Sequence, residues 1–131
     1  MLYVDTSALV KLVRVEAESE ALRTALADHV VACCELVLTE LYRAVVRYAD
    51  DEGRERVDLL LRSVELLTLD RSLLARAGRM APAQIRSSDA IHVAAATVLG
   101  GALVALVTYD RLMASAARFH GLDVWSPGMD P

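Results

Sequence analysis

The sequence contains only two cysteines in 131 residues, and these two, Cys33 and Cys34, are neighbours. Adjacent cysteines are too close in the chain for an ordinary loop-closing disulfide, and no CxxC pair or cysteine–histidine cluster indicates a zinc site. We therefore expect two buried free thiols in a reducing compartment. The composition, 55% hydrophobic and 24% charged, predicts one compact domain that can hold an apolar core without disulfide or metal staples.

The chain also lacks the hydrophobic segments that direct proteins into or across membranes. Its first residues, Met1 to Asp5, include no basic residue and soon reach an acid, so no secretory signal is expected. The uncharged stretch Val93–Tyr109 is near the lower length limit of a membrane-spanning helix. However, Gly100 and Gly101 divide it, which indicates a buried helix, a tight turn and a buried strand. We expect a cytoplasmic protein with no membrane partner.

Only one of the 14 basic residues is a lysine, Lys11, and the net charge is -4. An acidic net charge usually argues against a protein that binds nucleic acid. If four of the acids were grouped as metal ligands, the remaining charges would balance, and bound cations would reverse the local field. Arginine is also the better fork for phosphate. The net charge therefore does not exclude a nucleic-acid substrate.

Short apolar runs alternate with helical patterns along the chain. The predicted strands are Leu2–Val4, Val30–Cys33, Val64–Leu69, Leu103–Thr108 and Leu122–Trp125. One predicted helix opens at Thr6-Ser7, and the others are Ser19–Asp28, Glu35–Ala49, Arg54–Arg62, Asp70–Met80, one that follows Ser87–Asp89 and runs to about Leu99, and Asp110–His120. This alternation predicts a three-layer α/β/α domain with a mostly parallel sheet. Ligands bind such sheets at the carboxyl ends of the strands, near the point where strand order reverses.

Turn and capping residues mark several helix ends. The polar run Ser87–Asp89 is expected to cap the helix that runs to about Leu99. Pro82 ends the helix before it, and Gly121 follows the last helix. No repeat, low-complexity tract or linker interrupts the chain, so residues 1–131 are predicted to form a single domain.

Four acidic residues occupy positions where a carboxylate needs a partner. Asp5 ends the first predicted strand and Asp110 follows the fourth, so their carboxylates meet at one sheet edge if these strands are neighbours. Glu40 and Asp89 lie on helices among apolar residues, where an unpaired charge is costly. Each of the four therefore has to be paired or to coordinate a metal.

From the residues alone, two interpretations of these acids stay open. In the first, they form structural salt bridges with basic side chains; the candidates are Lys11, Arg43, Arg86 and Arg111. In the second, they group as ligands, and hard oxygen donors without a histidine or cysteine cluster suit Mg²⁺ or Mn²⁺ rather than zinc. Two such ions on a phosphate activate water and stabilise the leaving oxygen. Mutual repulsion within the group is expected to raise at least one carboxyl pKa.

Beyond these spacings, the sequence resembles the PIN-domain ribonucleases of the VapC toxin family, found in type II (VapBC) toxin–antitoxin systems. The order and spacing of four short motifs fit over essentially the whole chain. The matching stretches are Tyr3–Leu9 (YVDTSAL), Thr39–Arg43 (TELYR), Ser88–Ala96 (SDAIHVAAA) and Val107–Arg111 (VTYDR), then Ala116-Ala117 and a final segment with Gly121, Leu122, Val124, Pro127 and Gly128.

The resemblance implies a parallel five-stranded sheet of order 3-2-1-4-5 with about seven helices. It implies that Asp5, Glu40, Asp89 and Asp110 are the catalytic residues and the ligands of Mg²⁺ or Mn²⁺. The implied reaction is endoribonuclease cleavage by a metal-activated water, which leaves a 5′-phosphate and a 3′-hydroxyl. All four acids are present, which argues against an inactive copy. Asp5 and Asp110 are expected to be the nearest ligands.

Five further residues are candidates for supporting roles. Ser7 and Thr108 lie beside ligand positions, where their hydroxyls either orient a carboxylate or serve as an ordinary helix cap and strand-end hydrogen bond. His92, one helical turn after the third acid, is expected to pack, with contact to RNA as the alternative. Arg43 and Arg111 contact substrate phosphate or neutralise an acid.

The resemblance also implies partners. Toxins of this family resemble one another in forming homodimers and in being silenced by a small cognate antitoxin whose carboxyl-terminal segment reaches the acidic pocket. We therefore expect an RNA substrate, a VapB-like antitoxin, and a homodimer that forms a heterotetramer or a larger complex with the antitoxin. Tyr42, Val46 and Leu61 are candidates for a dimer face, but core packing is expected for each.

Other classes of protein also place acids at strand ends. Asp70 after the third strand and Thr108 after the fourth fit a phospho-acceptor signalling domain, but its paired acids after the first strand and its lysine near the last are missing. An aspartate-nucleophile phosphatase needs a second acid two residues beyond Asp5, where Ser7 stands. The remaining alternative is a module that binds RNA or protein without cutting.

Overall fold

The computed structural model describes residues 1–48 and 51–129, and this part of the chain contains one parallel sheet. The strand order is β3-β2-β1-β4-β5, and all neighbouring pairs are parallel. The strands are β1 (Leu2–Val4), β2 (Val31–Cys34), β3 (Val64–Leu67), β4 (Ala105–Val107) and β5 (Val124–Trp125). The expected order is confirmed, and the sheet is parallel throughout.

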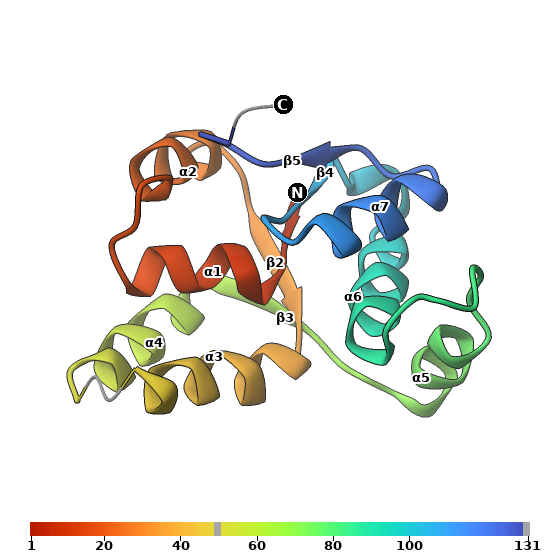
Figure 1. The fold of residues 1–131 in the computed structure, drawn as a ribbon, viewed down its shortest axis with the longest axis horizontal. Coiled ribbons are helices and arrows are strands. Elements are labelled where there is room, and N and C mark those ends of the chain that lie inside the picture. The colour runs from red at the N-terminus through yellow and green to blue at the C-terminus, as the bar shows by residue number, and fades with distance from the viewer. Residues whose placement is uncertain (49–50, 130–131) are drawn as a thin grey trace.

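Within the described residues, seven α-helices cover the two faces of this sheet (Figure 1). On one side lie α1 (Thr6–Val13), α2 (Ser19–Leu26), α3 (Leu36–Arg47) and α4 (Gly53–Arg62). On the other lie α5 (Arg71–Gly78), α6 (Ser87–Val98) and α7 (Arg111–Phe119). The chain moves from β1 toward β3, then returns across the sheet to β4 and β5. Right-handed crossovers therefore place the two groups of helices on opposite faces.

The core lies around the central strands. Every residue of β1 and β4 is buried, which explains their continuous apolar runs. At the sheet edge, β3 exposes Glu65 and Leu66, because one side of this strand has no neighbouring strand. Cys33 and Cys34 are buried and free, as predicted.

The uncharged stretch Val93–Tyr109 divides as expected into the end of α6, a short 3₁₀ helix (Gly100–Ala102) and β4. Among the described residues, no helix combines the length and the apolar character needed to span a bilayer.

Five helix starts differ from the sequence prediction, and among them α3 begins one residue later and α4 one residue earlier than predicted. Asp70 and Asp110 were expected inside their helices, but both precede them as N-caps whose side chains accept backbone N–H bonds. The run Ser87–Asp89 was expected to cap α6 but forms its first turn instead, preceded by Arg86. Because Asp89 accepts a hydrogen bond from the Arg86 guanidinium at 2.6 Å, its carboxylate is not directed to the backbone.

The three positions weighed for a dimer face have different environments. Tyr42 and Leu61 pack partly against the core, as expected. Val46 is 57% exposed, so the expectation of core packing was wrong there: α3 buries Val45, and the adjacent residue points away from the same face. Ala49, the predicted end of this helix, lies outside the described residues.

Candidate active site

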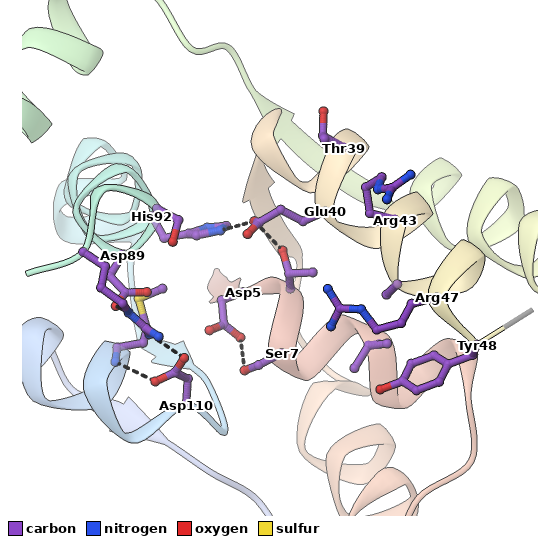
Figure 2. A pocket seen from close by; sticks show the side chains of 16 residues that line it. Asp5, Ser7, Thr39, Glu40, Arg43, Arg47, Tyr48, Asp89, His92 and Asp110 are labelled. Atoms are coloured by element: carbon purple, nitrogen blue, oxygen red, sulfur yellow. Dashed lines mark hydrogen bonds and ion pairs between the residues drawn. The ribbon is translucent and has the colours of Figure 1, made fainter.

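A pocket of about 520 Å³ lies beside the carboxyl ends of β1 and β4. These strands are neighbours at the point where the strand order reverses, the usual ligand site of such a sheet. All four predicted acids line the pocket (Figure 2); they are Asp5 after β1, Glu40 on α3, Asp89 on α6 and Asp110 after β4. The fold thus brings together four carboxylates that are widely separated in the sequence.

Asp5 is the most constrained of these acids. It is the N-cap of α1 and is only 2% exposed. The Ser7 hydroxyl and the Ala8 N–H donate to Oδ1 at 2.7 and 3.1 Å, and the Thr108 hydroxyl donates to Oδ2 at 2.5 Å. Burial raises the pKa of Asp5 more than these bonds lower it. One raised carboxyl pKa was expected, but its main cause is burial rather than repulsion between acids.

Ser7 and Thr108 therefore contact a pocket carboxylate directly. The same hydroxyls also accept backbone N–H bonds from Tyr109 and Asp110, each at 3.0 Å. They join the start of α1 to the loop after β4. The two expectations for these residues, orientation of a carboxylate and a local hydrogen bond, are met by one pair of hydroxyls.

Asp89 and Asp110 share one arginine. Arg86 donates from Nε to Asp89 Oδ2 and from an Nη atom to Asp110 Oδ2, both at 2.6 Å. Burial tends to raise the pKa of Asp110, but Arg86 and the amides of Leu112 and Met113 outweigh it and lower the pKa. The salt-bridge interpretation thus holds for this pair. Arg86 was predicted as a candidate ion-pair partner of these acids, and this is confirmed. Its position three residues before Asp89 is the sequence signal that the two side chains are neighbours.

Glu40 is held by two side chains. The Thr6 hydroxyl donates to Oε1 at 2.8 Å, and His92 Nε2 lies 2.7 Å from the same oxygen (Figure 2). Burial tends to raise the pKa of Glu40, but the bonds to His92 and Thr6 outweigh it and lower the pKa. His92 was expected to pack or to reach RNA. It is buried, which agrees with packing, and its ring nitrogens are hydrogen-bonded, because a polar ring can be buried only with partners.

The other predicted basic residues lie around the pocket or outside it. Arg43 lines the pocket with an exposed side chain, and among the described residues it makes no ion pair with Glu40, so the neutralising role is not seen. Arg111 lines an adjacent pocket that shares Asp110. Lys11 pairs with Glu16 and Glu18 rather than with any of the four acids.

Several residues on the pocket wall were not predicted as site residues, and two of them are polar side chains at the end of α3. Arg47 and Tyr48, at the end of α3, line the pocket beside Arg43 (Figure 2). Nothing in their local sequence distinguishes them from the other polar residues of an exposed helix end. Only the packing of α3 beside α1 brings them to this wall.

The donor chemistry of the pocket fits Mg²⁺ or Mn²⁺, since its four acids supply hard oxygen atoms. In residues 1–48 and 51–129, no three histidine, cysteine, aspartate or glutamate side chains form a preassembled metal-binding group. Mg²⁺ is commonly held by one or two carboxylates, with water and substrate phosphates completing its coordination. The pocket therefore fits such an ion and does not form a closed protein cage for it.

The buried Asp5 carboxylate predicts that Asp5→Asn stabilises the protein in the presence of a chelator. Because the folded-state pKa is raised, the native state binds a proton that the unfolded state releases, and stability falls as pH rises from the ordinary 3.8 through the raised value. The variant has no carboxyl group at this position and does not lose this stability. The difference in unfolding free energy between the variant and the wild-type protein therefore grows as pH rises across that window and stays constant above it. Glu40 and Asp110, with lowered pKa values, contribute the opposite slope in both proteins.

Urea denaturation from pH 3 to pH 8 measures this difference. Mn²⁺ at 100 times its dissociation constant should add roughly 2.7 kcal/mol to the wild-type protein, and less to the variant. If the variant and the wild-type protein differ in unfolding free energy by the same amount at every pH, burial of Asp5 does not raise its pKa and the prediction is wrong.

Comparison with known proteins agrees with this fold. The family model described as "PIN domain" matches residues 2–123. The chain is 40% identical over 133 aligned positions to Ribonuclease VapC47 of Mycobacterium tuberculosis, with 98% of each protein covered. It is 38% identical to Ribonuclease VapC46 of the same species over 127 positions, covering 96% of this chain and 97% of the relative. The chain belongs to the PIN-domain family, and within it to the VapC proteins.

Solved structures show the same fold at lower sequence identity. VapC20 of Mycobacterium tuberculosis, described as a sarcin-ricin loop cleaving toxin, superposes with a TM-score of 0.70 at 19% identity, covering 88% of this chain and 95% of that one. A chain of VapBC2 from Rickettsia felis, solved with a promoter DNA fragment, gives 0.67 at 17% identity, covering 95% and 98%.

Proposed function

We propose that this protein is the toxin of a type II toxin–antitoxin system, a cytoplasmic endoribonuclease that depends on Mg²⁺ or Mn²⁺. The observation that carries the proposal is the convergence of Asp5, Glu40, Asp89 and Asp110 on one pocket at the switch point of the sheet. The 40% identity to a protein named a ribonuclease supports RNA as the substrate.

Two of the acids, Asp5 and Glu40, are held by neighbouring side chains in a way that suits a ligand. Asp5 is oriented at both oxygens before any ligand binds, so no side-chain ordering is needed when it takes up a cation. Glu40 has one oxygen held by Thr6 and His92 and the other available to the pocket. A divalent ion held by the carboxylates of the pocket would supply the activation of water and the stabilisation of the leaving oxygen, and the proposed products are a 5′-phosphate and a 3′-hydroxyl.

Arginines around the pocket reduce the repulsion between its carboxylates and the phosphates of RNA. Arg43 and Arg47 line the wall formed by α3, and Arg111 lines the neighbouring pocket beyond Asp110. Guanidinium groups bind phosphate in a bidentate manner and favour contact with a nucleic-acid backbone. We assign these three residues to backbone binding rather than to cleavage.

A VapB-like antitoxin is the proposed inhibitor. The VapBC2 complex of Rickettsia felis shows that a protein of this fold is found with an antitoxin partner. A guanidinium from such a partner would satisfy the pocket carboxylates in the way that Arg86 satisfies Asp89 and Asp110 here. We further propose that the toxin forms homodimers, and a heterotetramer or larger complex with the antitoxin.

Incubation of the purified, antitoxin-free chain with total cellular RNA tests the nuclease. Parallel reactions contain Mg²⁺, Mn²⁺ or chelator, with Asp5→Asn as the control, and the cut ends are mapped. Discrete cuts with 5′-phosphate ends that require metal and are absent from the control are expected. Absence of cutting on every RNA, with metal still bound, would replace the proposal with a module that binds RNA or protein without cleavage. Absence of toxicity on expression would remove the toxin assignment alone.

A further inference from the structure

A buried hydrogen-bond chain leads from the core to Glu40. Tyr3, in the centre of β1, places its hydroxyl 2.8 Å from His92 Nδ1, and His92 Nε2 lies 2.7 Å from Glu40 Oε1. Tyr3 is fully buried and His92 is 2% exposed. The Cys34 N–H, at the end of β2, donates to the Tyr3 hydroxyl at 3.1 Å. Four elements, β1, β2, α6 and α3, are thereby connected to one carboxylate of the pocket.

These contacts determine which ring nitrogen faces Glu40 with a proton. The Tyr3 hydroxyl accepts from Cys34, and burial raises the pKa of Tyr3, so it keeps its own proton and needs an acceptor. In the neutral ring, Nδ1 is that acceptor and Nε2 carries the hydrogen. In the protonated ring both nitrogens carry hydrogens, so Nε2 again faces Glu40 with a proton. Nε2–H therefore donates to Glu40 in both forms.

The same geometry excludes the more obvious roles of a histidine at this site. With 2% of its surface exposed, His92 cannot stack on a base or bind phosphate. Both ring nitrogens are engaged by Tyr3 and Glu40, so neither is free to ligate a metal. A buried imidazole needs polar partners in any case, but two bonds of 2.7 and 2.8 Å to residues on different elements fix the ring in orientation as well as in position.

We propose that His92 is a positioning residue for Glu40: held by Tyr3, it fixes Oε1 and so presents Oε2 to the pocket. The Thr6 hydroxyl binds the same Oε1 from the α1 side, so the carboxylate is held from two directions. A second partner that holds a ligand side chain typically changes metal affinity or activity by 10–100-fold when it is removed. The link to cleavage rests on the proposed nuclease function, but the link to Glu40 does not.

Nitrogen-15 NMR of the imidazole rings tests the hydrogen position without any activity. The chain has three histidines, and His92→Gln identifies the signal of interest by its loss. We expect a shift pattern of a ring protonated at Nε2, and a change of that pattern in Tyr3→Phe, which keeps the buried ring but removes the hydroxyl. A neutral His92 protonated only at Nδ1 would overturn the proposal.

A double-mutant cycle tests whether His92 acts through Glu40. His92→Gln, Glu40→Gln and the double variant are compared for Mn²⁺ binding by calorimetry and for RNA cleavage, with His29→Gln as the control for a histidine outside the pocket. His92→Gln should weaken Mn²⁺ binding about 10-fold and lower kcat 10–100-fold with little change in KM. In the Glu40→Gln background, His92→Gln should change neither Mn²⁺ affinity nor kcat further.

Effects of His92→Gln that persist at full size in the Glu40→Gln background would overturn the proposal. If His92→Gln does not fold, as judged by circular dichroism, Tyr3→Phe takes its place in the cycle, with a smaller effect in the same direction and the same dependence on Glu40. If the wild-type protein cuts no RNA, the nuclease proposal fails, while the NMR pattern and the Mn²⁺ cycle still decide the role of His92.

Discussion

Asp89→Asn is expected to lower RNA cleavage about 1,000-fold, or ~4 kcal/mol in transition-state stabilisation, while the protein stays folded. Asp89 is only 4% exposed, and its carboxylate lines the pocket. Asparagine has the same shape but lacks the charge and one acceptor oxygen. The expected loss of cleavage therefore measures what the charged carboxylate contributes at this position.

The fold should tolerate this change because the hydrogen-bond pattern around it survives. The amide oxygen of asparagine can accept the bond from Arg86 Nε, and Arg86 keeps its second bond to Asp110. Single-turnover cleavage and thermal melting measure the two effects separately. Asp28→Asn, which removes an exposed acid after α2, is the matched control. A loss of less than 10-fold, with the melting temperature unchanged, would show that Asp89 is an ion-pair residue only.

Leu106→Ala is expected to destabilise the protein by about 3 kcal/mol, because it removes a buried side chain from the centre of the sheet. Leu106 is 0% exposed in β4, between β1 and β5. Such a loss lowers the melting temperature of a domain of this size by about 10 °C. The control is Leu59→Ala, which removes the same atoms from a side chain that is 63% exposed on α4.

Urea denaturation and thermal melting both give this comparison. Equal destabilisation by the two leucine variants would contradict the assignment of β4 to the interior. The result also bears on the site, because Thr108 and Asp110 follow β4 directly, and a shift of this strand moves the hydroxyl that holds Asp5.

Local signals along the chain predicted much of this fold. Apolar runs separated by helical spacing predicted five strands and seven helices, and their positions agree within a few residues, because a buried parallel strand has to be apolar on both faces. Boundaries were less accurate: Asp70 and Asp110 cap their helices, and Ser87 begins one, because capping depends on where a side chain finds a donor. The strand order came from resemblance rather than from pattern.

The sequence by itself determined the acids that would matter. Asp5 and Asp110 follow apolar strands, and Glu40 and Asp89 interrupt apolar helix faces, so each had to be paired or bound to a cation. Whether they are catalytic stays a prediction. The topology brings Asp5 and Asp110 together, since the ends of neighbouring parallel strands meet at one edge. Glu40 and Asp89 reach the same pocket from the helices α3 and α6 that carry them.

Only the tertiary structure decided which side chains partner these acids. Arg86 bridges Asp89 and Asp110, and the chain from Tyr3 through His92 ends on Glu40. Nothing in the local sequence distinguishes Tyr3 from any other residue of a buried strand. Hydrogen bonds depend on distances of a few tenths of an ångström between atoms of different elements, and those distances arise only when the layers pack.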